Sequence, residues 1–252
     1  MRAAAIIPAR YGSTRFPGKP LAELLGRPMI AWVVEAAKSA RKVDEVCVAT
    51  DDERIALASS LAGARVVMTS PECASGTDRV AEAARSVIAD LYLNVQGDEP
   101  AVDPLDLTRL VEAFEGDDPP VMATLARPVE SQEVANDPNA VKVVRASNGD
   151  ALYFSRSPIP HQRDGGGRKD QAVPTLLHVG VYAYTREALF AFAAMREGGL
   201  ERVEKLEQLR ALEAGWRISV IDALGEPGVG VDRPEDLAKA EKLLAKRLAG
   251  VK

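Results

Sequence analysis

Cysteine and histidine are scarce in this sequence, which holds two residues of each among 252. Cys47 and Cys73 stand in neither a CxxC nor another metal-binding spacing, so we predict no disulfide framework and no zinc site. Both cysteines are interpreted as reduced residues that fill space. Neither histidine stands beside a nucleophile in a catalytic pattern, so a histidine-activated nucleophile is not indicated.

Long apolar runs and an excess of positive charge are also missing. The apolar stretch at residues 3–7 is too short for a signal peptide and far too short to span a bilayer, so we expect a cytoplasmic protein with no membrane contact. The formal net charge of -5 gives no long-range attraction for nucleic acid or anionic lipid. No nucleic acid partner is expected, and phosphate binding would need a local cationic pocket.

The first half of the sequence alternates short apolar runs with helical patterns. Strands are predicted at 3–7, 45–49, 65–68 and 91–95, and helices at 29–40, 53–61 and 77–88. This pattern is typical of an α/β protein with a doubly wound, mostly parallel sheet. Ligands bind at the carboxyl ends of the strands in such sheets, so the segments that follow these strands are expected to meet at one crevice.

The second half is less regular. Strands are predicted at 121–125, 141–145, 151–155, 179–184 and 217–221, and helices at 104–114, 187–194, 200–214 and 234–248. We predict one domain of residues 1–252, in which residues 127–225 form a smaller inserted α+β lobe. Residues 163–170 contain three consecutive glycines and are expected to form a surface loop.

The loop after the first strand, residues 8–20, carries Arg10, Arg15 and Lys19. A turn with glycine and serine at a strand end exposes backbone N–H groups, and three cations close together supply the charge that a triphosphate needs. The loop has neither the GxxxxGK[ST] spacing of a P-loop nor the GxGxxG pattern of dinucleotide folds. We interpret it as a phosphate-binding loop, with a ligand-free basic surface loop as the alternative.

Two aspartates are candidates for binding a metal. Asp98 follows a buried strand and a glycine, and Asp232 precedes a predicted helix that begins near Pro234. Mg²⁺ prefers one or two carboxylates together with phosphate oxygens and water. The alternatives are a turn for Asp98 and a helix N-cap for Asp232.

Several segments, in their order along nearly the whole chain, resemble those of CMP-Kdo synthetases (3-deoxy-manno-octulosonate cytidylyltransferases). They are IIPARYGSTRFPGKPL, VATDD, SGTDR, NVQGDEP, DPNAVKVV, ALYFSR, HVGVYAY, LEQLR and GVDRPEDL. The PAR…PGK loop alone also resembles that of CMP-sialic acid synthetases, whereas NVQGDEP, ALYFSR and LEQLR are similar to the Kdo branch. The resemblance implies a nucleotidyltransferase that transfers CMP from CTP to the anomeric hydroxyl of Kdo for lipopolysaccharide synthesis.

The resemblance also implies the roles of individual residues. It makes Arg10, Lys19, Asp98 and Asp232 catalytic, with Mg²⁺ on the two aspartates. The nucleotide-binding set is Ala9, Arg10, Gly12, Ser13, Arg15, Lys19, Ser75, Gly76, Arg79 and Gln96. The sugar-binding set is Gln96, Arg156, His178, Tyr184, Glu207 and Gln208, in which Arg156 offers a fork for the sugar carboxylate. Residues 1–126 and 226–252 would bind the nucleotide, and residues 127–225 would bind the sugar and form a homodimer.

The expected mechanism is in-line attack of the sugar hydroxyl on the α-phosphorus of CTP, which depends on positioning and electrostatics. Two Mg²⁺ ions are expected, of which the second, between Asp98 and Asp232, lowers the pKa of the attacking hydroxyl. Two alternatives are a related acidic sugar, such as 8-amino Kdo or a nonulosonic acid, and a regulatory nucleotide-binding protein without catalysis.

Some residues carry no functional prediction, and one segment departs from the family pattern. Lys142 is expected to be solvated and the pair Asp51 and Asp52 to cap a helix. Residues 198–205 lack the serine or proline common in the family, and the paired glycines at 198 and 199 predict a loose helix start. This departure concerns the sugar pocket more than the nucleotide site.

Overall fold

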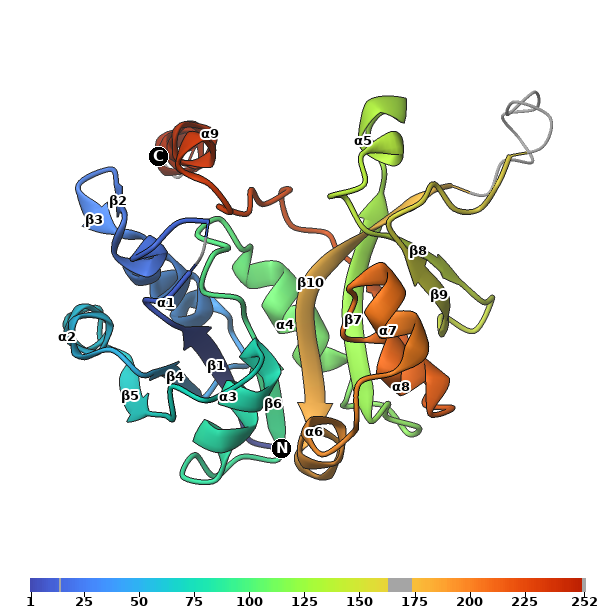
Figure 1. Ribbon diagram of the computed structural model, residues 1–252, viewed down its shortest axis with the longest axis horizontal. Helices are drawn as coiled ribbons and strands as arrows, with labels where there is room; N and C mark the ends of the chain where they lie inside the picture. Colours follow the sequence, from blue (N-terminus) through green and yellow to red (C-terminus); the bar gives the residue numbers. More distant parts are fainter. Residues whose placement is uncertain (14, 163–173, 251–252) are drawn as a thin grey trace.

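The computed structural model describes residues 1–13, 15–162 and 174–250 (Figure 1). The surface loop predicted at 163–170 lies outside these residues. The first half forms β1 (Ala3–Ala9), η1 (Lys19–Leu21), β2 (Glu23–Leu24), β3 (Arg27–Pro28), α1 (Met29–Ser39), β4 (Glu45–Thr50), α2 (Glu53–Leu61), β5 (Arg65–Met68), α3 (Gly76–Ala84), β6 (Leu91–Asn94) and α4 (Pro104–Glu112). The second half forms β7 (Met122–Pro128), α5 (Gln132–Asn136), β8 (Lys142–Arg145), β9 (Ala151–Ser155), β10 (Leu176–Thr185), α6 (Arg186–Ala193), α7 (Gly199–Glu204), α8 (Leu209–Glu213), β11 (Ser219–Asp222), η2 (Pro234–Asp236) and α9 (Leu237–Gly250).

One twisted sheet runs through the molecule in the order β11-β7-β10-β6-β1-β4-β5. Strands β6, β1, β4 and β5 are parallel neighbours, as are β11 and β7. Strand β10 is antiparallel to both β6 and β7, and the β8–β9 hairpin joins the sheet through β10. The predicted α/β fold with helices on both faces of a mixed, largely parallel sheet is confirmed.

The residues of β1 show why both faces are covered. Ala3, Ala5 and Ile7 pack in the core under α1 and α4, whereas Ala4 and Ile6 pack in the core under α3 and α6. Successive side chains of a strand point to opposite faces, so a continuous run of apolar residues requires helices on both sides. All seven residues of β1 are buried, which places the end of this strand, and the loop that follows it, on a rigid base.

The strands of the predicted inserted lobe are part of this same sheet. Strand β7 contains the boundary placed between residues 126 and 127, and both β10 and β11 pair with it. In Figure 1 β7 and β10 cross the middle of the molecule beside β6, and β8, β9, α7 and α8 lie on the far side from β5. The division of the chain into two functional parts stays a prediction.

The prediction of a single helix at 200–214 is wrong, because this segment forms two helices, α7 and α8. Lys205 ends α7 with a left-handed φ of 54°, so the chain turns before α8 begins at Leu209. The expected loose start is not observed either. The carboxylate of Glu213 accepts hydrogen bonds from the backbone N–H groups of Gly199 (3.1 Å) and Leu200 (3.0 Å), which caps the first turn of α7.

The C-terminal helix α9 returns the end of the chain to the first half. Its Ala240 and Leu244 pack with Trp32 of α1 and with Val231 in a small apolar cluster. Val231 is 1% exposed, so it anchors the segment just before η2 against the first half of the sheet. No helix among the described residues combines the length and apolar composition that crossing a membrane requires.

Candidate functional site

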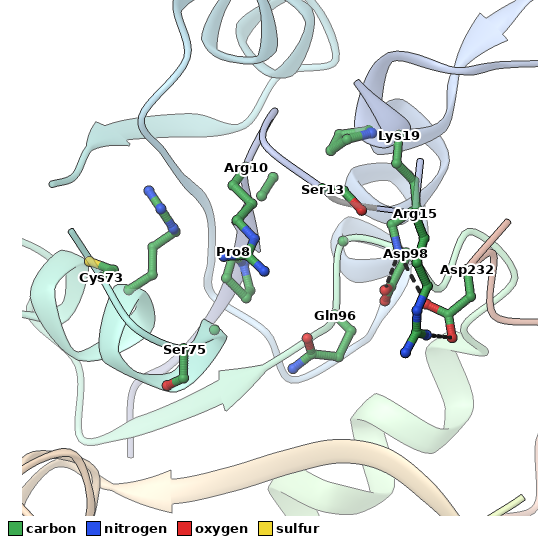
Figure 2. A pocket seen from close by; sticks show the side chains of 15 residues that line it. Pro8, Arg10, Ser13, Arg15, Lys19, Cys73, Ser75, Gln96, Asp98 and Asp232 are labelled. Carbon is green, nitrogen blue, oxygen red and sulfur yellow. Dashed lines mark hydrogen bonds and ion pairs between the residues drawn. The ribbon is translucent and has the colours of Figure 1, made fainter. Parts of the chain in front are cut away.

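A pocket of about 370 Å³ opens where β1 and β6 end and where α3 begins. Figure 2 shows side chains from the loop after β1, from the start of α3, from the loop after β6 and from the segment before η2 around it. It is lined by Pro8, Ala9, Arg10, Ser13, Arg15, Lys19, Pro20, Cys73, Ser75, Gly76, Arg79, Gln96, Gly97, Asp98 and Asp232. The predicted convergence at the carboxyl ends of the strands is therefore observed for residues 8–20, 75–79 and 96–100, whereas Asp51 and Asp52, also expected there, do not line the pocket.

The lining contains every residue of the predicted nucleotide-binding set except Gly12, and it also contains Asp98 and Asp232. The predicted sugar residues Arg156, His178, Tyr184, Glu207 and Gln208 do not line it; only Gln96 belongs to both predicted sets. Sequence reasoning missed Cys73, which was interpreted as a space filler. Its position two residues before the SGTDR segment was the available signal.

The loop after β1 is closed by the backbone of Tyr11. The Tyr11 carbonyl accepts hydrogen bonds from the N–H groups of Ser13 and Gly18, both at 2.9 Å. The Tyr11 ring lies so close to Gly18 that a Cβ there would be 2.9 Å from the ring, and Gly18 has a left-handed φ of 72°. These contacts hold Arg10, Arg15 and Lys19 on one compact loop.

Lys19 joins the two aspartates across the pocket. Its Nζ lies 2.7 Å from Oδ2 of Asp98 and 3.5 Å from Oδ1 of Asp232, while Nη1 of Arg15 lies 3.7 Å from Oδ2 of Asp232 (Figure 2). The Lys19 side chain is 13% exposed, whereas that of Asp232 is 66% exposed. One ammonium group therefore holds together two carboxylates that come from distant parts of the chain.

Asp232 is not the helix cap that its position suggested. Arg233 is the N-cap residue of η2, and Asp236 inside η2 reaches back, because its Oδ2 accepts hydrogen bonds from the backbone N–H groups of Asp232 (3.1 Å) and Arg233 (3.0 Å). The N–H of Val231 donates to the carbonyl of Asp98 at 2.9 Å, which ties the two aspartate-bearing segments together. The carboxylate of Asp232 is thus left to face Lys19 and Arg15.

Negative charge accumulates beside Lys19. Burial, followed by the charges of Asp98 and Asp232, raises the pKa of Glu99 to about 8. Within the described part of the chain, no three Asp, Glu, His or Cys side chains form a ready metal cage. Two neighbouring carboxylates with an open side suit Mg²⁺, which keeps water and phosphate oxygens among its ligands. The residues present fit such an ion.

The pocket wall at the start of α3 is held by the first turns of that helix. Ser75 caps α3 and forms a reciprocal capping box with Asp78. Arg79, only 2% exposed, donates to Oγ1 of Thr69 (2.6 Å) and to Oδ2 of Asp51 (3.1 Å). The Arg79 guanidinium therefore supports the wall from below.

Asp51 thus pairs with Arg79, whereas its neighbour caps a helix. Asp52 caps α2 by accepting from the N–H groups of Arg54 and Ile55, as expected for an aspartate before a helix. On α3, Glu82 accepts from the Cys73 thiol at 3.1 Å and from the Ser70 N–H at 2.9 Å. Burial and this contact with Glu82 raise the pKa of Cys73 to about 11, so its thiol stays protonated at neutral pH.

Glu207 connects the predicted sugar residues to the pocket. Its Oε2 accepts a hydrogen bond of 2.6 Å from the hydroxyl of Thr77 on α3. Three buried polar atoms in this region have no hydrogen-bond partner among the described residues: Gln208 Nε2, the Tyr182 hydroxyl and Glu207 Oε1, which lies 3.6 Å from Nη2 of Arg210. Burial, followed by Tyr184 and Glu207, raises the pKa of Tyr182, and burial, followed by the Glu207 charge, raises the pKa of Tyr184. Buried polar atoms without partners are typical of a ligand site.

Tyr182 was missed by sequence reasoning, which selected Tyr184. Both tyrosines lie on β10, but a shift of register between Val179 and Tyr182 marks an irregularity that sequence periodicity does not reveal. Tyr184 is 1% exposed and packs with Phe192, with ring centres 5.7 Å apart. Tyr182 stacks between His178 and Tyr184, at 5.4 and 6.0 Å. The hydroxyl without a partner is that of Tyr182.

His178 is held by Thr124 of β7, whose Oγ1 lies 3.0 Å from its Nε2. The Thr124 hydroxyl has one proton, which it donates to the Val181 carbonyl (2.8 Å). Nε2 of His178 must therefore donate, which leaves Nδ1 as an acceptor. Burial lowers the pKa of His178 to about 3, so the ring is neutral above that pH.

Arg156 is committed to backbone carbonyls. Its guanidinium donates to the carbonyls of Glu204 (2.8 Å), Pro138 (3.0 Å) and Lys205 (3.4 Å). The expectation that Lys142 is solvated is wrong: Lys142 is 0% exposed, and its Nζ donates to the carbonyls of Asp137, Ala140 and Arg156. The buried Lys142 and the half-buried Arg156 tie this region together, and the role of Arg156 in binding a carboxylate stays a prediction.

The sequence and the fold were compared with known proteins. The model of the family described as Cytidylyltransferase matches residues 4–218. A 3-deoxy-manno-octulosonate cytidylyltransferase of Anaeromyxobacter sp. (strain Fw109-5) is 54% identical over 97% of both chains. A protein of the same name from Geobacter metallireducens is 49% identical over 98% of this chain and 99% of its own.

A solved structure has the same fold. CMP:2-keto-3-deoxy-manno-octonic acid synthetase, determined in complex with CTP, superposes with a TM-score of 0.90 at 43% identity, over 98% of this chain and all of the other. Agreement over the full length of both chains covers the first half, which carries the pocket, and the second half, which carries His178, Tyr182 and Glu207.

Proposed function

Because the chain belongs to the cytidylyltransferase family, and within it to the 3-deoxy-manno-octulosonate cytidylyltransferases, we infer that it transfers CMP from CTP to Kdo and releases pyrophosphate. The observation that carries this activity is the full-length match to enzymes of that name, together with a pocket in which a cationic loop faces two carboxylates. The chain is an enzyme, and the reaction is nucleotidyl transfer to the anomeric hydroxyl of an acidic sugar.

We propose that the cations of the loop after β1 bind the triphosphate. Arg10, Arg15 and Lys19 line one side of the pocket, where they would neutralise the charge that grows on the departing pyrophosphate. The hydrogen bonds of Tyr11 keep these cations in place before CTP arrives. Positioning the α-phosphorus in line with the sugar hydroxyl then requires little covalent chemistry from the protein.

We propose magnesium as the cofactor, held by Asp98 and Asp232. The support is their convergence on the single ammonium of Lys19, which leaves two carboxylates beside one cation. When bound, the metal would supply positive charge to phosphate oxygens and to the attacking hydroxyl. Lys19 would be free to turn from Asp98 toward the leaving phosphates.

We propose that the sugar binds among His178, Tyr182, Glu207 and Gln208. Nδ1 of neutral His178 and Oε1 of Glu207 are acceptors, and the Tyr182 hydroxyl and Gln208 Nε2 are donors. A sugar with several hydroxyls would satisfy such a mixed set of polar atoms. Arg156 and Tyr184, which are occupied by carbonyls and by packing, would support this site from outside.

The test of the activity is pyrophosphate release by the purified protein with CTP, Mg²⁺ and Kdo. UTP, ATP and sialic acid, each in place of the corresponding substrate, serve as controls. Release that requires both CTP and Kdo is the expected result. Release with CTP and 8-amino Kdo or a nonulosonic acid, but not with Kdo, would show that another acidic sugar is the substrate. No release with any pair of substrates would favour nucleotide binding without catalysis.

We also propose that the protein acts as a homodimer in the cytoplasm and supplies lipopolysaccharide synthesis. The support for a dimer is the edge strand β9, which among the described strands pairs only with β8, and the exposed side chains of Leu152 (63%) and Val203 (83%) in the second half. Sedimentation at assay concentration tests this. A monomer there would contradict the proposal.

A further inference from the structure

A chain of hydrogen bonds links Glu207, in the proposed sugar site, to Gln96 in the nucleotide pocket. The Thr77 hydroxyl donates to Glu207 Oε2 (2.6 Å), Asn94 Nδ2 donates to Thr77 Oγ1 (3.2 Å), and Gln96 Nε2 donates to Asn94 Oδ1 (3.0 Å). Thr77 is 3% exposed and Asn94 is 1% exposed. Water therefore does not compete for the two middle members.

The direction of every bond in this chain follows from its first member. A carboxylate at neutral pH has no proton to donate, so Thr77 must give its only hydroxyl proton to Glu207. Thr77 Oγ1 can then only accept, which turns the NH₂ group of Asn94 toward it. The Asn94 oxygen is left facing Gln96 and accepts from its NH₂ group.

The last member, Gln96, is consequently oriented as an acceptor. One N–H of its Nε2 is engaged by Asn94, which fixes the orientation of the amide and leaves the carboxamide oxygen free to accept from a ligand. A Cβ on Gly76 would lie 3.5 Å from this oxygen and 3.9 Å from the nitrogen, so the oxygen is the amide atom nearer to the start of α3. The same strand register supports the arrangement, because Asn94 of β6 stands directly opposite Tyr182 of β10.

We propose that Thr77 and Asn94 are positioning residues, which use the charge of Glu207 to present the Gln96 oxygen as a hydrogen-bond acceptor for a hydroxyl at the junction of nucleotide and sugar. This inference rests on the proposed function of the two half-sites. Neither Thr77 nor Asn94 needs to touch a substrate. A hydrogen bond from the sugar to Glu207 would thereby change the hydrogen bonding of Gln96 in the nucleotide pocket.

The first test removes the Thr77 hydroxyl proton, which fixes the direction of the hydrogen bonds. Thr77→Val keeps the shape of the side chain and cannot donate, so kcat with CTP and Kdo should fall by about tenfold, the scale of a lost hydrogen bond. The dissociation constant for CTP without sugar should change by less than about threefold. Thr77→Ser keeps the hydroxyl and should restore kcat, which a purely steric role of the threonine would not predict.

The second test is a double-mutant cycle with Gln96→Ala. If Thr77 acts through Gln96, Thr77→Val should lower kcat by less than about twofold once the Gln96 carboxamide is absent. An equal loss in both backgrounds would overturn the proposal. Should Thr77→Val fail to fold, Thr77→Ala enters the same cycle, because alanine likewise has no proton to donate to Glu207.

The activity of the unmodified protein distinguishes a failure of this proposal from a failure of the proposed function. Turnover of CTP and Kdo by the unmodified protein, with additive losses in the cycle, would refute the relay and leave the enzyme assignment intact. Absence of turnover by the unmodified protein with any acidic sugar would overturn the function and, with it, the relay.

Discussion

The guanidinium of Arg54 lies flat above the ring of Tyr11, 3.6 Å from its centre. Two hydrogen bonds to the Asp52 carboxylate, at 3.0 and 2.6 Å, fix the guanidinium in that position. The stack ties α2 to the loop after β1, because the Tyr11 carbonyl closes that loop through Ser13 and Gly18. Arg54 thus supports the loop that carries Arg10, Arg15 and Lys19 without lining the pocket.

Loss of this stack should weaken the binding of CTP. Exposed cation–π pairs contribute about 0.5–1 kcal/mol, so Arg54→Leu should raise KM for CTP about two- to fivefold and change kcat little. Steady-state kinetics of pyrophosphate release measure both. Glu53→Gln, on the exposed neighbouring residue, is the control, and an unchanged KM for Arg54→Leu would show that the loop holds its shape without the stack.

The two aspartates at Lys19 should be indispensable for turnover. Asp98→Asn and Asp232→Asn keep the size of the side chains but remove the charge that would hold a metal, so kcat should fall by at least about a hundredfold. Binding of Mn²⁺, followed by electron paramagnetic resonance, should weaken in both variants. Asp117→Asn, in an exposed loop, is the control. Near-normal turnover of both variants would remove the proposed metal site.

The start of α7 depends on Glu213. A Cβ on Gly198 would lie 2.0 Å from its Oε2, so Gly198→Ala should displace the carboxylate that caps Gly199 and Leu200. We expect a loss of about 1 kcal/mol of unfolding free energy, the usual cost of a lost cap. Urea denaturation measures it. Glu213→Ala should cost a similar amount, and the double variant should cost no more than either single one.

Gly116→Ala is the matched control for this position, because a Cβ there meets no atom within 4 Å. If Gly198→Ala proved as stable as Gly116→Ala, the Glu213 cap would contribute nothing to the stability of α7.

The half-buried His178 predicts a dependence of stability on pH. Its pKa of about 3 in the folded protein lies below its ordinary value of 6.5, so the folded state binds the proton less well than the unfolded state. The stabilisation is complete above pH 6.5 and is lost progressively as the pH falls toward 3. Between pH 7 and 5 the unmodified protein should lose about 1–2 kcal/mol more than His178→Gln.

Denaturant unfolding at the two pH values measures this difference. His161→Gln, which removes the exposed histidine, should behave as the unmodified protein does. Equal losses for the unmodified protein and His178→Gln would show that His178 is hydrated and free to take up a proton in the folded state.

Local patterns were enough to predict the first half of the fold and its pocket. Strand β5 and helix α2 have the predicted bounds, because apolar periodicity and the Asp52 cap both mark their ends. The nucleotide-binding residues follow the carboxyl ends of parallel strands, and that topology alone brings them together. Asp98 and Asp232 converge because α9 returns the end of the chain to α1.

The second half depends on contacts that a single sequence does not reveal. The bend at Lys205 needs a left-handed backbone at a residue that gives no local signal. The sequence around Lys142 is typical of a solvated lysine on a strand. In the structure its ammonium group is buried and donates hydrogen bonds to three backbone carbonyls. Tyr182, and not Tyr184, has the hydroxyl without a hydrogen-bond partner in the proposed sugar site. This difference depends on the register shift in β10, which tertiary packing decides.

Strand β10 has one further consequence for this enzyme. Because it is hydrogen-bonded to β6 along the register that sets Tyr182 opposite Asn94, the two proposed half-sites are spaced by a continuous sheet. A change of sugar specificity would accordingly require exchanged side chains on β6 and β10. A change in the spacing of the two half-sites would instead break the backbone hydrogen bonds between these strands.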